Sequence, residues 1–529
     1  MWVRGERFAV FALVFATVAV AVAPGAIFSG GDQFDGPSPE RIAQLEDQFR
    51  PYEDQFDQQI DRDAQVVVLL KQGAPVPEGH GLQIERVEVR EGSHYLHGSI
   101  PYSKITTLSA DPRTETILIE HRPRLPAIEN RVATGVVTIG ATDLHDQGVR
   151  GDNVTVGIVG RGFRVSSPEI ADYVGAYRTF STEDSAPAAD AHGTAVASIV
   201  ADTAPNATLY LADVGTETTA SEYDRAITWL LDSEVDIVLD AGSYFDEGTA
   251  ESSINDIANR ASEEVVFVTS AGNYAERHWQ GNPSAADGSW VSFADGVEGN
   301  ALAGGAPITG EVHLTLSWNT SDDYDLYLLR ETGAQDTVVA KSTSRQTEGA
   351  SSVERLSVMV PQGQYYVGIY GHQTTGNTSL DLFSSKRNLT YATPEGSLAA
   401  PATAPSVLTV GSSDGRDVAA FSSRGPTADG RNGVDLVAPG GVGGVDIAGV
   451  SAGTSVSASY AAGSAALLKS AYPGLSAAEI TALLTDSATD LGEEGVDSES
   501  GYGEVNVSAA YERAKEKYEP RETGIATGP

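Results

Sequence analysis

Three side chains in this sequence have the types that acyl-transfer chemistry needs. His192 opens the segment HGTAVAS, Ser455 lies in GTSVSAS, and Asn273 ends VVFVTSAGN. An imidazole can remove the proton of a serine hydroxyl and so make it a nucleophile. A carboxamide N–H can stabilise the oxyanion of the tetrahedral intermediate that follows. Together the three residues predict a site for nucleophilic attack on a carbonyl carbon.

Each of these residues also has an ordinary structural interpretation when it is taken singly. A histidine at a helix start is as often structural as catalytic, and a Gly-Thr-Ser run such as residues 453–455 is usually a capped helix. Their joint occurrence favours a shared site, because a nucleophile, a base and an oxyanion donor are complementary parts of one mechanism.

The segments around these residues predict an α/β fold. Apolar runs typical of buried parallel strands alternate with amphipathic helical segments such as residues 221–233. The predicted strands are 154–160, 208–214, 236–242 and 265–273. Such alternation is typical of a doubly wound parallel sheet, in which the working residues gather where strands end.

Two further folded units are predicted outside this pattern. Residues 65–130 mix strand-like and helical segments, which predicts a small α+β domain. Residues 296–389 show recurrent strand-like alternation between Gly, Asn, Asp and Thr turns, which predicts an inserted β-sandwich. A polar linker is predicted at 30–64 and a C-terminal tail at 513–529.

Three aspartates of the predicted sandwich, Asp322, Asp323 and Asp325, could supply oxygen ligands to a structural calcium ion. The alternative is a solvated acidic turn. No other pattern predicts a metal site, and the acyl-transfer chemistry requires no cofactor.

Several segments, in order, resemble the subtilisin-like serine proteases, peptidase family S8. GDNVTVGIVGRGFRVSSPEI, HGTAVASIVADTAPNATLYLADV and VVFVTSAGN resemble the family's aspartate, histidine and oxyanion segments. GTSVSASYAAGSAALL resembles its nucleophile turn and helix, and SKITTLSADPRTETILIE resembles the end of its inhibitory propeptide. Each motif alone is weak evidence for the family, whereas the occurrence of all of them in the family's order is specific evidence.

The resemblance implies a serine endopeptidase with a subtilisin-like sheet. The catalytic domain would comprise residues 135–295 and 390–512, and residues 65–130 would be propeptide-like. His192 would be the base, Ser455 the nucleophile and Asn273 the oxyanion donor, acting on a protein or peptide substrate. The alternative for residues 65–130 is an N-terminal domain with no inhibitory role.

One member of the family's catalytic set is missing. Where the family has its aspartate, this chain reads Ile158, Val159, Gly160, Arg161. A glycine can neither orient an imidazole nor stabilise its cationic form. In subtilisin, removal of that aspartate lowers kcat by about 3 × 10⁴.

A neighbouring carboxylate could replace the missing acid. The family's topology would place the strands ending at Asp213 and Asp240 on either side of the strand ending at Gly160, so both aspartates are candidates. The alternative function is that of an inactive pseudoprotease, a peptide-binding or interaction module. Ala241 and Gly242 would then keep the strand edge that pairs with an extended peptide.

The charge balance predicts salt adaptation. The 529 residues include 73 acidic and 34 basic side chains, giving a net charge of -39, while 41% are hydrophobic, as in globular proteins. Self-repulsion on this scale opposes folding in dilute buffer and is screened at molar salt. The alternative is an acidic surface that is indifferent to salt. Nucleic acids and anionic membrane surfaces would repel the chain, and no cysteine is present.

The N-terminus has the layout of a Sec-type secretory signal. Arg4 and Arg7 precede an apolar run over residues 8–23. Because the run can be extended to residue 28, residues 1–29 are predicted to be either a cleaved signal peptide or an uncleaved membrane anchor. The expected location is extracellular or at the cell surface.

Overall fold

The computed structural model describes most of the chain from residue 63 onward. The described ranges are 63–119 (without 78, 91 and 92), 134–181, 191–245 (without 217), 252–283, 288–332, 336–345, 352–441 (without 377) and 452–518. The predicted signal or anchor and almost all of the predicted linker lie outside them, as do residues 519–529 of the predicted tail. Within these ranges, no helix has the length and apolar character needed to cross a membrane.

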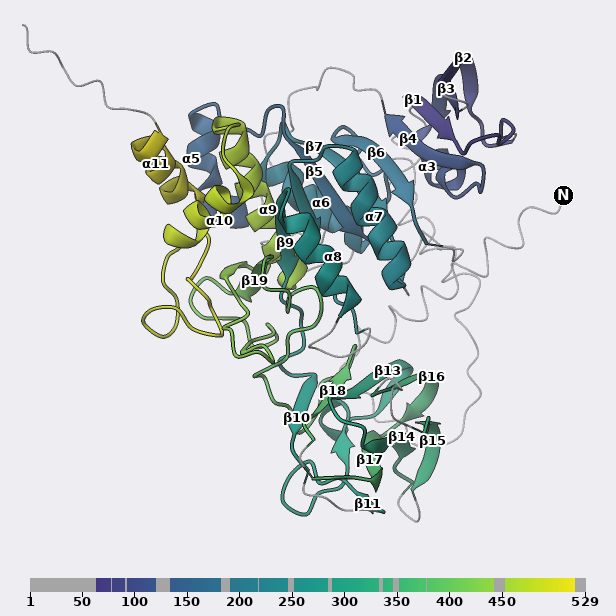
Figure 1. The fold of residues 1–529 in the computed structure, drawn as a ribbon, viewed down its shortest axis with the longest axis vertical. Helices are drawn as coiled ribbons and strands as arrows, with labels where there is room; N and C mark the ends of the chain where they lie inside the picture. Colours follow the sequence, from purple (N-terminus) through teal and green to yellow (C-terminus); the bar gives the residue numbers. More distant parts are fainter. Residues whose placement is uncertain are drawn as a thin grey trace, which may run out of the picture. The chain divides into compact units, whose positions relative to one another are not determined.

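A run of seven parallel strands forms the centre of the molecule (Figure 1). In spatial order they are β6 (Val174–Thr179), β7 (Thr208–Asp213), β5 (Thr155–Gly160), β8 (Ile237–Asp240), β9 (Val266–Ser270), β19 (Leu408–Ser413) and β20 (Leu436–Pro439). Strand order reverses around β5, as expected for a doubly wound sheet. The predicted α/β fold class is confirmed.

Helices cover both faces of this sheet. The helices α6 (His192–Thr203) and α9 (Thr454–Ala471) share one apolar core with Ile158 of β5. The helices α7 (Ala220–Asp232) and α8 (Ser253–Ser262) share a second core with Val159 on the opposite face. The remaining helices of this part are α4 (Thr134–Thr138), α5 (Ala141–Asp146), α10 (Ala477–Asp486) and α11 (Val507–Tyr518).

The sequence of α7 shows why these helices form where they do. Thr219 and Glu222 form a reciprocal capping box that satisfies backbone donors at the start of the helix. Tyr223, Ile227 and Leu230 recur at helical spacing and are fully buried against the sheet. The capping pair fixes the start of α7, and the apolar stripe fixes the face it presents.

The N-terminal domain is a small antiparallel sheet with one helix. Its elements are β1 (Asp63–Leu70), β2 (Gln83–Arg90), β3 (Ser93–Pro101), α3 (Tyr102–Ser109) and β4 (Thr114–Ile119). The strand order is β2-β3-β1-β4, and β4 continues into the central sheet by pairing antiparallel with β6.

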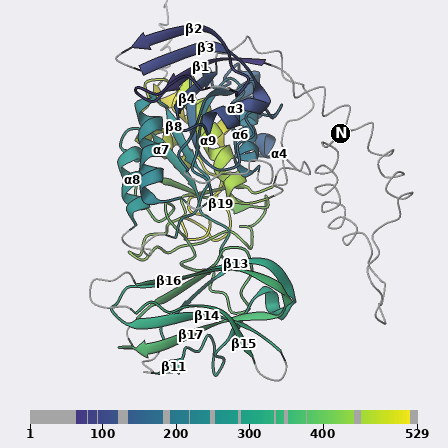
Figure 2. The ribbon, with the colours of Figure 1, turned by 90° about the vertical axis from the view of Figure 1, so that its right-hand side faces the viewer.

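The inserted unit is a two-layered antiparallel β-sandwich (Figure 2). One sheet contains β10 (His278–Gly281), β18 (Leu380–Ser384), β13 (Ile308–Trp318) and β16 (Val353–Gly363). The other contains β11 (Ser289–Trp290), β17 (Tyr365–Gln373), β14 (Asp323–Arg330) and β15 (Thr337–Ser342), with β12 (Asn300–Ala301) also paired to β17. The sandwich therefore includes β10 and β11, which precede the predicted start at residue 296.

Candidate active site

His192 and Ser455 meet at the starts of two helices. His192 is the first residue of α6 and Ser455 the second of α9, 263 positions further along the chain. The imidazole Nε2 lies 3.0 Å from the serine Oγ. Ser455 is buried, with 6% of its surface exposed, and His192 is half-buried. This distance is within hydrogen-bond reach and permits proton transfer between the two side chains.

The hydroxyl of Ser455 has a second neighbour. Its Oγ also lies 3.0 Å from the carbonyl oxygen of Ala241, the residue that follows β8. A hydroxyl carries one proton, so it donates either to this carbonyl or to His192 Nε2 at any moment. Attack on a substrate requires the second arrangement, in which the imidazole accepts the proton.

Asn273 joins the same site through the start of α9. Its Oδ1 accepts a hydrogen bond from the backbone N–H of Thr454 at 3.1 Å. Because the oxygen of the carboxamide is held there, the Nδ2 donor is turned away from Thr454. An oxyanion next to Ser455 could accept from Nδ2, and the positive end of the helix dipole of α9 would act in the same direction.

The start of α6 is held by a close contact between its backbone and the loop after β5. The N–H of Gly193 donates to the carbonyl oxygen of Arg161, in the loop after β5, at 2.7 Å. A Cβ at Gly193 would lie 2.6 Å from that oxygen and 2.7 Å from the ring of Phe163. Only a glycine permits this contact, which fixes where the preceding His192 begins the helix.

Gly160 ends β5 on the sheet face that carries α6 and α9. A Cβ at this position would lie 3.3 Å from Cζ of the buried Phe163 ring. The ring therefore stands beside the position from which the family's aspartate would project. The sequence pattern did not predict this role of Phe163, nor the contact of Ser455 with a carbonyl, because backbone acceptors leave no side-chain signature.

Asp240 lies on the opposite face of the sheet from Gly160. Its register partner on β5 is Val159, and paired residues of parallel strands point to the same side. Asp240 accepts hydrogen bonds from the Tyr223 hydroxyl of α7 at 2.7 Å and from the Gly242 N–H at 2.8 Å. Complete burial raises the pKa of Asp240 to about 6, against the effect of these hydrogen bonds.

Asp213 lies on the same face as Gly160, which is its direct register partner. It is 4% exposed and accepts hydrogen bonds from the Tyr177 hydroxyl and the Gly215 N–H, each at 3.0 Å. Of the two predicted replacement acids, Asp213 is therefore the one on the side of α6.

The acidic cluster of the sandwich is buried, so its interpretation as a solvated turn is wrong. Asp322, Asp323 and Asp325 are between 2% and 8% exposed. Asp322 accepts from the backbone N–H of Thr375 at 2.9 Å, and Asp325 lies 2.8 Å from Nε2 of His372. Among the residues that the structure describes, no group of three His, Asp or Glu side chains is arranged to hold a metal ion.

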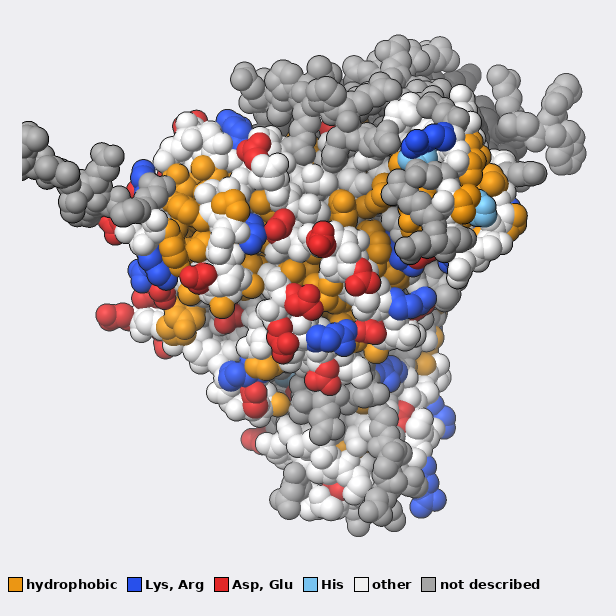
Figure 3. All heavy atoms as spheres, turned by 45° about the horizontal axis from the view of Figure 1, so that its top comes forward, with side chains coloured by type: hydrophobic (Ala, Val, Ile, Leu, Met, Phe, Trp, Pro, Cys, Tyr) orange, Lys and Arg blue, Asp and Glu red, His pale blue; other side chains and the backbone are white. Residues whose placement is uncertain are grey.

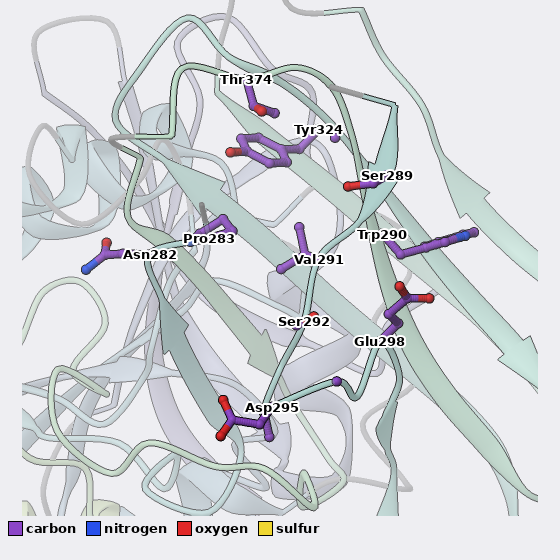
Figure 4. Close-up of a pocket in the computed structure, with 13 residues that line it drawn as sticks. Asn282, Pro283, Ser289, Trp290, Val291, Ser292, Asp295, Glu298, Tyr324 and Thr374 are labelled. Carbon is purple, nitrogen blue, oxygen red and sulfur yellow. The ribbon is translucent and has the colours of Figure 1, made fainter. Parts of the chain in front are cut away.

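A pocket of about 550 Å³ lies in the sandwich, apart from the paired histidine and serine (Figure 4). Its lining includes Trp290, Val291, Asp295 and Glu298. The ring of Trp290 points away from Val291 and packs on Tyr327. Of the two aromatic residues in the lining, Tyr324 and Trp290, the ring of Trp290 is thus engaged by a neighbouring tyrosine.

A histidine and a serine within hydrogen-bond reach at two helix starts, with an asparagine carboxamide held beside the serine, are arranged as in a serine-hydrolase type of site. The family model described as the subtilase family, Peptidase_S8, matches residues 151–371 and 314–503, more than half of the chain. The chain therefore belongs to the subtilase family.

Two named relatives match over shorter segments. A halolysin-like extracellular serine protease, Nep, of Natrialba magadii is 40% identical over 121 residues, which cover 22% of this chain and 21% of the relative. An extracellular serine protease of Serratia marcescens is 43% identical over 58 residues, covering 11% of this chain and 6% of the relative. The matched segments thus span about a fifth or less of each relative.

The fold is also similar to a solved structure. The CspB protease of Clostridium perfringens superposes with a TM-score of 0.50 at 15% identity, covering 72% of this chain and 98% of that one. At this level of identity the likeness concerns the fold alone.

Proposed function

We propose that this chain is an exported, salt-adapted serine endopeptidase that hydrolyses peptide bonds through Ser455, His192 and Asn273. The observation that carries the proposal is the 3.0 Å contact between His192 Nε2 and Ser455 Oγ. Membership of the subtilase family and the match to extracellular serine proteases support the same reaction class.

In the proposed reaction, Ser455 Oγ attacks the substrate carbonyl carbon while its proton passes to His192 Nε2. The resulting oxyanion accepts hydrogen bonds from Asn273 Nδ2 and the backbone N–H of Ser455. The C–N bond then breaks, and the leaving amine takes the proton from His192. A water molecule hydrolyses the acyl-enzyme by the same steps, with His192 again acting first as base and then as acid.

Asp213 is the residue that we propose as the supporting acid. It stands one strand away from Gly160, on the same face of the sheet, at a carboxyl end. A carboxylate there would favour the imidazolium electrostatically from a longer range than the aspartate of the family. The proposed enzyme is therefore slower than a subtilase that has the catalytic aspartate as well as the histidine and the serine.

Export and salt adaptation rest on separate observations. The basic and apolar N-terminal pattern matches a secretory signal, and both named relatives are extracellular proteases. One relative is halolysin-like, and this chain carries a net charge of -39. Figure 3 shows acidic side chains spread over the middle of one face, with basic side chains beside several of them.

Hydrolysis of an unfolded protein substrate at molar salt tests the proposed activity. The purified chain should release peptides, and Ser455→Ala should abolish the release. Because Ser455→Ala removes only the hydroxyl, activity that survives in this variant would come from a contaminant or another site and would contradict the proposal.

One observation favours a second candidate function, that of a pseudoprotease which binds peptides. Gly160 stands where the family's acid would be, while the segment Ala241 to Gly242 keeps a backbone edge beside Ser455. This candidate predicts equal peptide binding by the wild-type chain and by Ser455→Ala, with hydrolysis by neither.

A further inference from the structure

The N-terminal domain joins the rest of the chain through a shared sheet edge. In Figure 1, β4 lies beside β6; Ile117 of β4 is paired with Tyr177 of β6, and Leu118 with Ala176. Beside this pairing, Glu115 and Arg178 form an ion pair at 3.8 Å. The backbone of β6 thus has a partner on each side, β7 and β4.

The apolar core is continuous across the same boundary. Ile117 and Ile119 of β4 belong to one buried cluster with Val174, Tyr177 and Phe163. Tyr177 is 2% exposed, and its hydroxyl donates to Asp213. Removal of β4 would leave β6 as an open edge strand beside buried apolar side chains, an arrangement that promotes aggregation.

The paired strands lie well away from the nucleophile. The strand order β4-β6-β7-β5-β8 places four steps between β4 and the strand that precedes Ala241. At about 4.8 Å a step this separation is about 19 Å. Pairing at the β6 edge therefore leaves the strand end beside Ser455 uncovered by β4.

We propose that the N-terminal domain, residues 63–119, is a permanent edge of the catalytic sheet that stays bound after the chain is cut. In this role it completes the hydrogen bonds of β6 and covers its apolar side chains. Its last described strand, β4, pairs at the β6 edge and not at the strand that precedes Ala241. The proposal stands independently of the proposed activity, because it concerns only how the two parts are held together.

The test uses the full chain with the recognition sequence of a site-specific protease inserted in the segment 120–133, between β4 and α4. The chain is cut at molar salt and passed over a gel-filtration column at micromolar concentration. The matched control carries the same recognition sequence in the tail 519–529. A second readout is hydrogen exchange at the backbone amides of residues 176–178 in the cut protein.

The two fragments should elute together, with residues 176–178 as slowly exchanging as in the control. Separation of the fragments without denaturant would overturn the proposal. Faster exchange at residues 176–178 in the cut protein than in the control would also overturn it. The elution result does not require an active nucleophile, so it holds even if the protein hydrolyses nothing.

A substitution in β4 gives a second line of test. Leu118, which is 38% exposed, is the register partner of both Ala176 of β6 and Val67 of β1, so Leu118→Pro weakens β4 in the sheet, and Leu118→Thr is the matched control that keeps the N–H. In the cut protein the proline variant should lose its N-terminal fragment at a lower denaturant concentration than the threonine variant. Release of the fragment at equal denaturant concentrations from both variants would contradict a role for the strand pairing. If the proline variant does not fold, the gel filtration of the cut wild-type chain still tests the proposal.

Discussion

Gly160 and Asp213 are direct register partners on neighbouring parallel strands, and their positions point to the same face of the sheet. Asp240, at the end of the strand on the other side, is paired with Val159 and points to the opposite face. Relative to β5, the two aspartates are offset by one residue. Asp213 therefore points to the face that carries α6, whereas Asp240 points to the face that carries α7.

This difference predicts opposite outcomes for two matched substitutions. Asp213→Asn should lower kcat at least about tenfold, because it removes the carboxylate proposed to favour the imidazolium. Asp240→Asn should leave kcat within about twofold at neutral pH. Both aspartates are buried, so melting temperatures measured in parallel separate catalytic from structural effects. Equal kcat values for the two variants would contradict the assignment of Asp213.

Gly160→Asp should raise kcat by at least about 10²-fold, since the aspartate of subtilisin contributes about 3 × 10⁴. The ring of Phe163 must move by a few tenths of an ångström, because the new Cβ would lie 3.3 Å from it. The same substitution should rescue Asp213→Asn. The measurement is peptide hydrolysis at molar salt, with Gly160→Asn as the uncharged control. No gain in either background would show that the missing acid does not limit the rate.

Asn273→Ala should lower kcat by about 10²–10³ while KM changes little, because the proposed role of the carboxamide is to stabilise the oxyanion of the intermediate and not the bound substrate. The matched control is Asn282→Ala, at an exposed asparagine of the sandwich. A change confined to KM would place Asn273 in substrate binding instead.

Asp240 predicts a pH dependence of stability. Burial raises its pKa to about 6 from 3.8, so the folded chain holds this proton to higher pH than the unfolded chain does. Its unfavourable contribution is absent below about pH 4 and grows to about 3 kcal/mol above pH 6. Asp240→Asn should therefore gain stability relative to wild type as pH rises from 4 to 7, measured by denaturant unfolding. A constant difference across this range would contradict the raised pKa.

The net charge of -39 predicts that the melting temperature falls when salt is diluted from about 1 M to about 0.1 M, as the screening length grows from about 3 Å to about 10 Å. Neutral osmolytes at the same osmolarity are the control, since they do not screen charge. An unchanged melting temperature would favour the acidic but salt-indifferent surface.

Much of this architecture could be predicted from local patterns. The motifs around His192, Asn273 and Ser455 predicted one site because each belongs to a strand end or helix start that the fold brings together. The faces of Asp213 and Asp240 could not be predicted, since a register shift of one residue reverses a side chain's direction. The pairing of β4 with β6 also escaped prediction, because it joins segments whose separate sequences carry no signal for each other.

The central claim is that His192 activates Ser455. The most direct measurement is covalent labelling by a serine-directed phosphonate at molar salt, with the modified residue located by mass spectrometry. The wild-type chain should be labelled at Ser455, whereas His192→Ala, folded to the same melting temperature, should not. A wild-type chain that stays unlabelled although folded, or a His192→Ala variant labelled at the wild-type rate, would contradict the account.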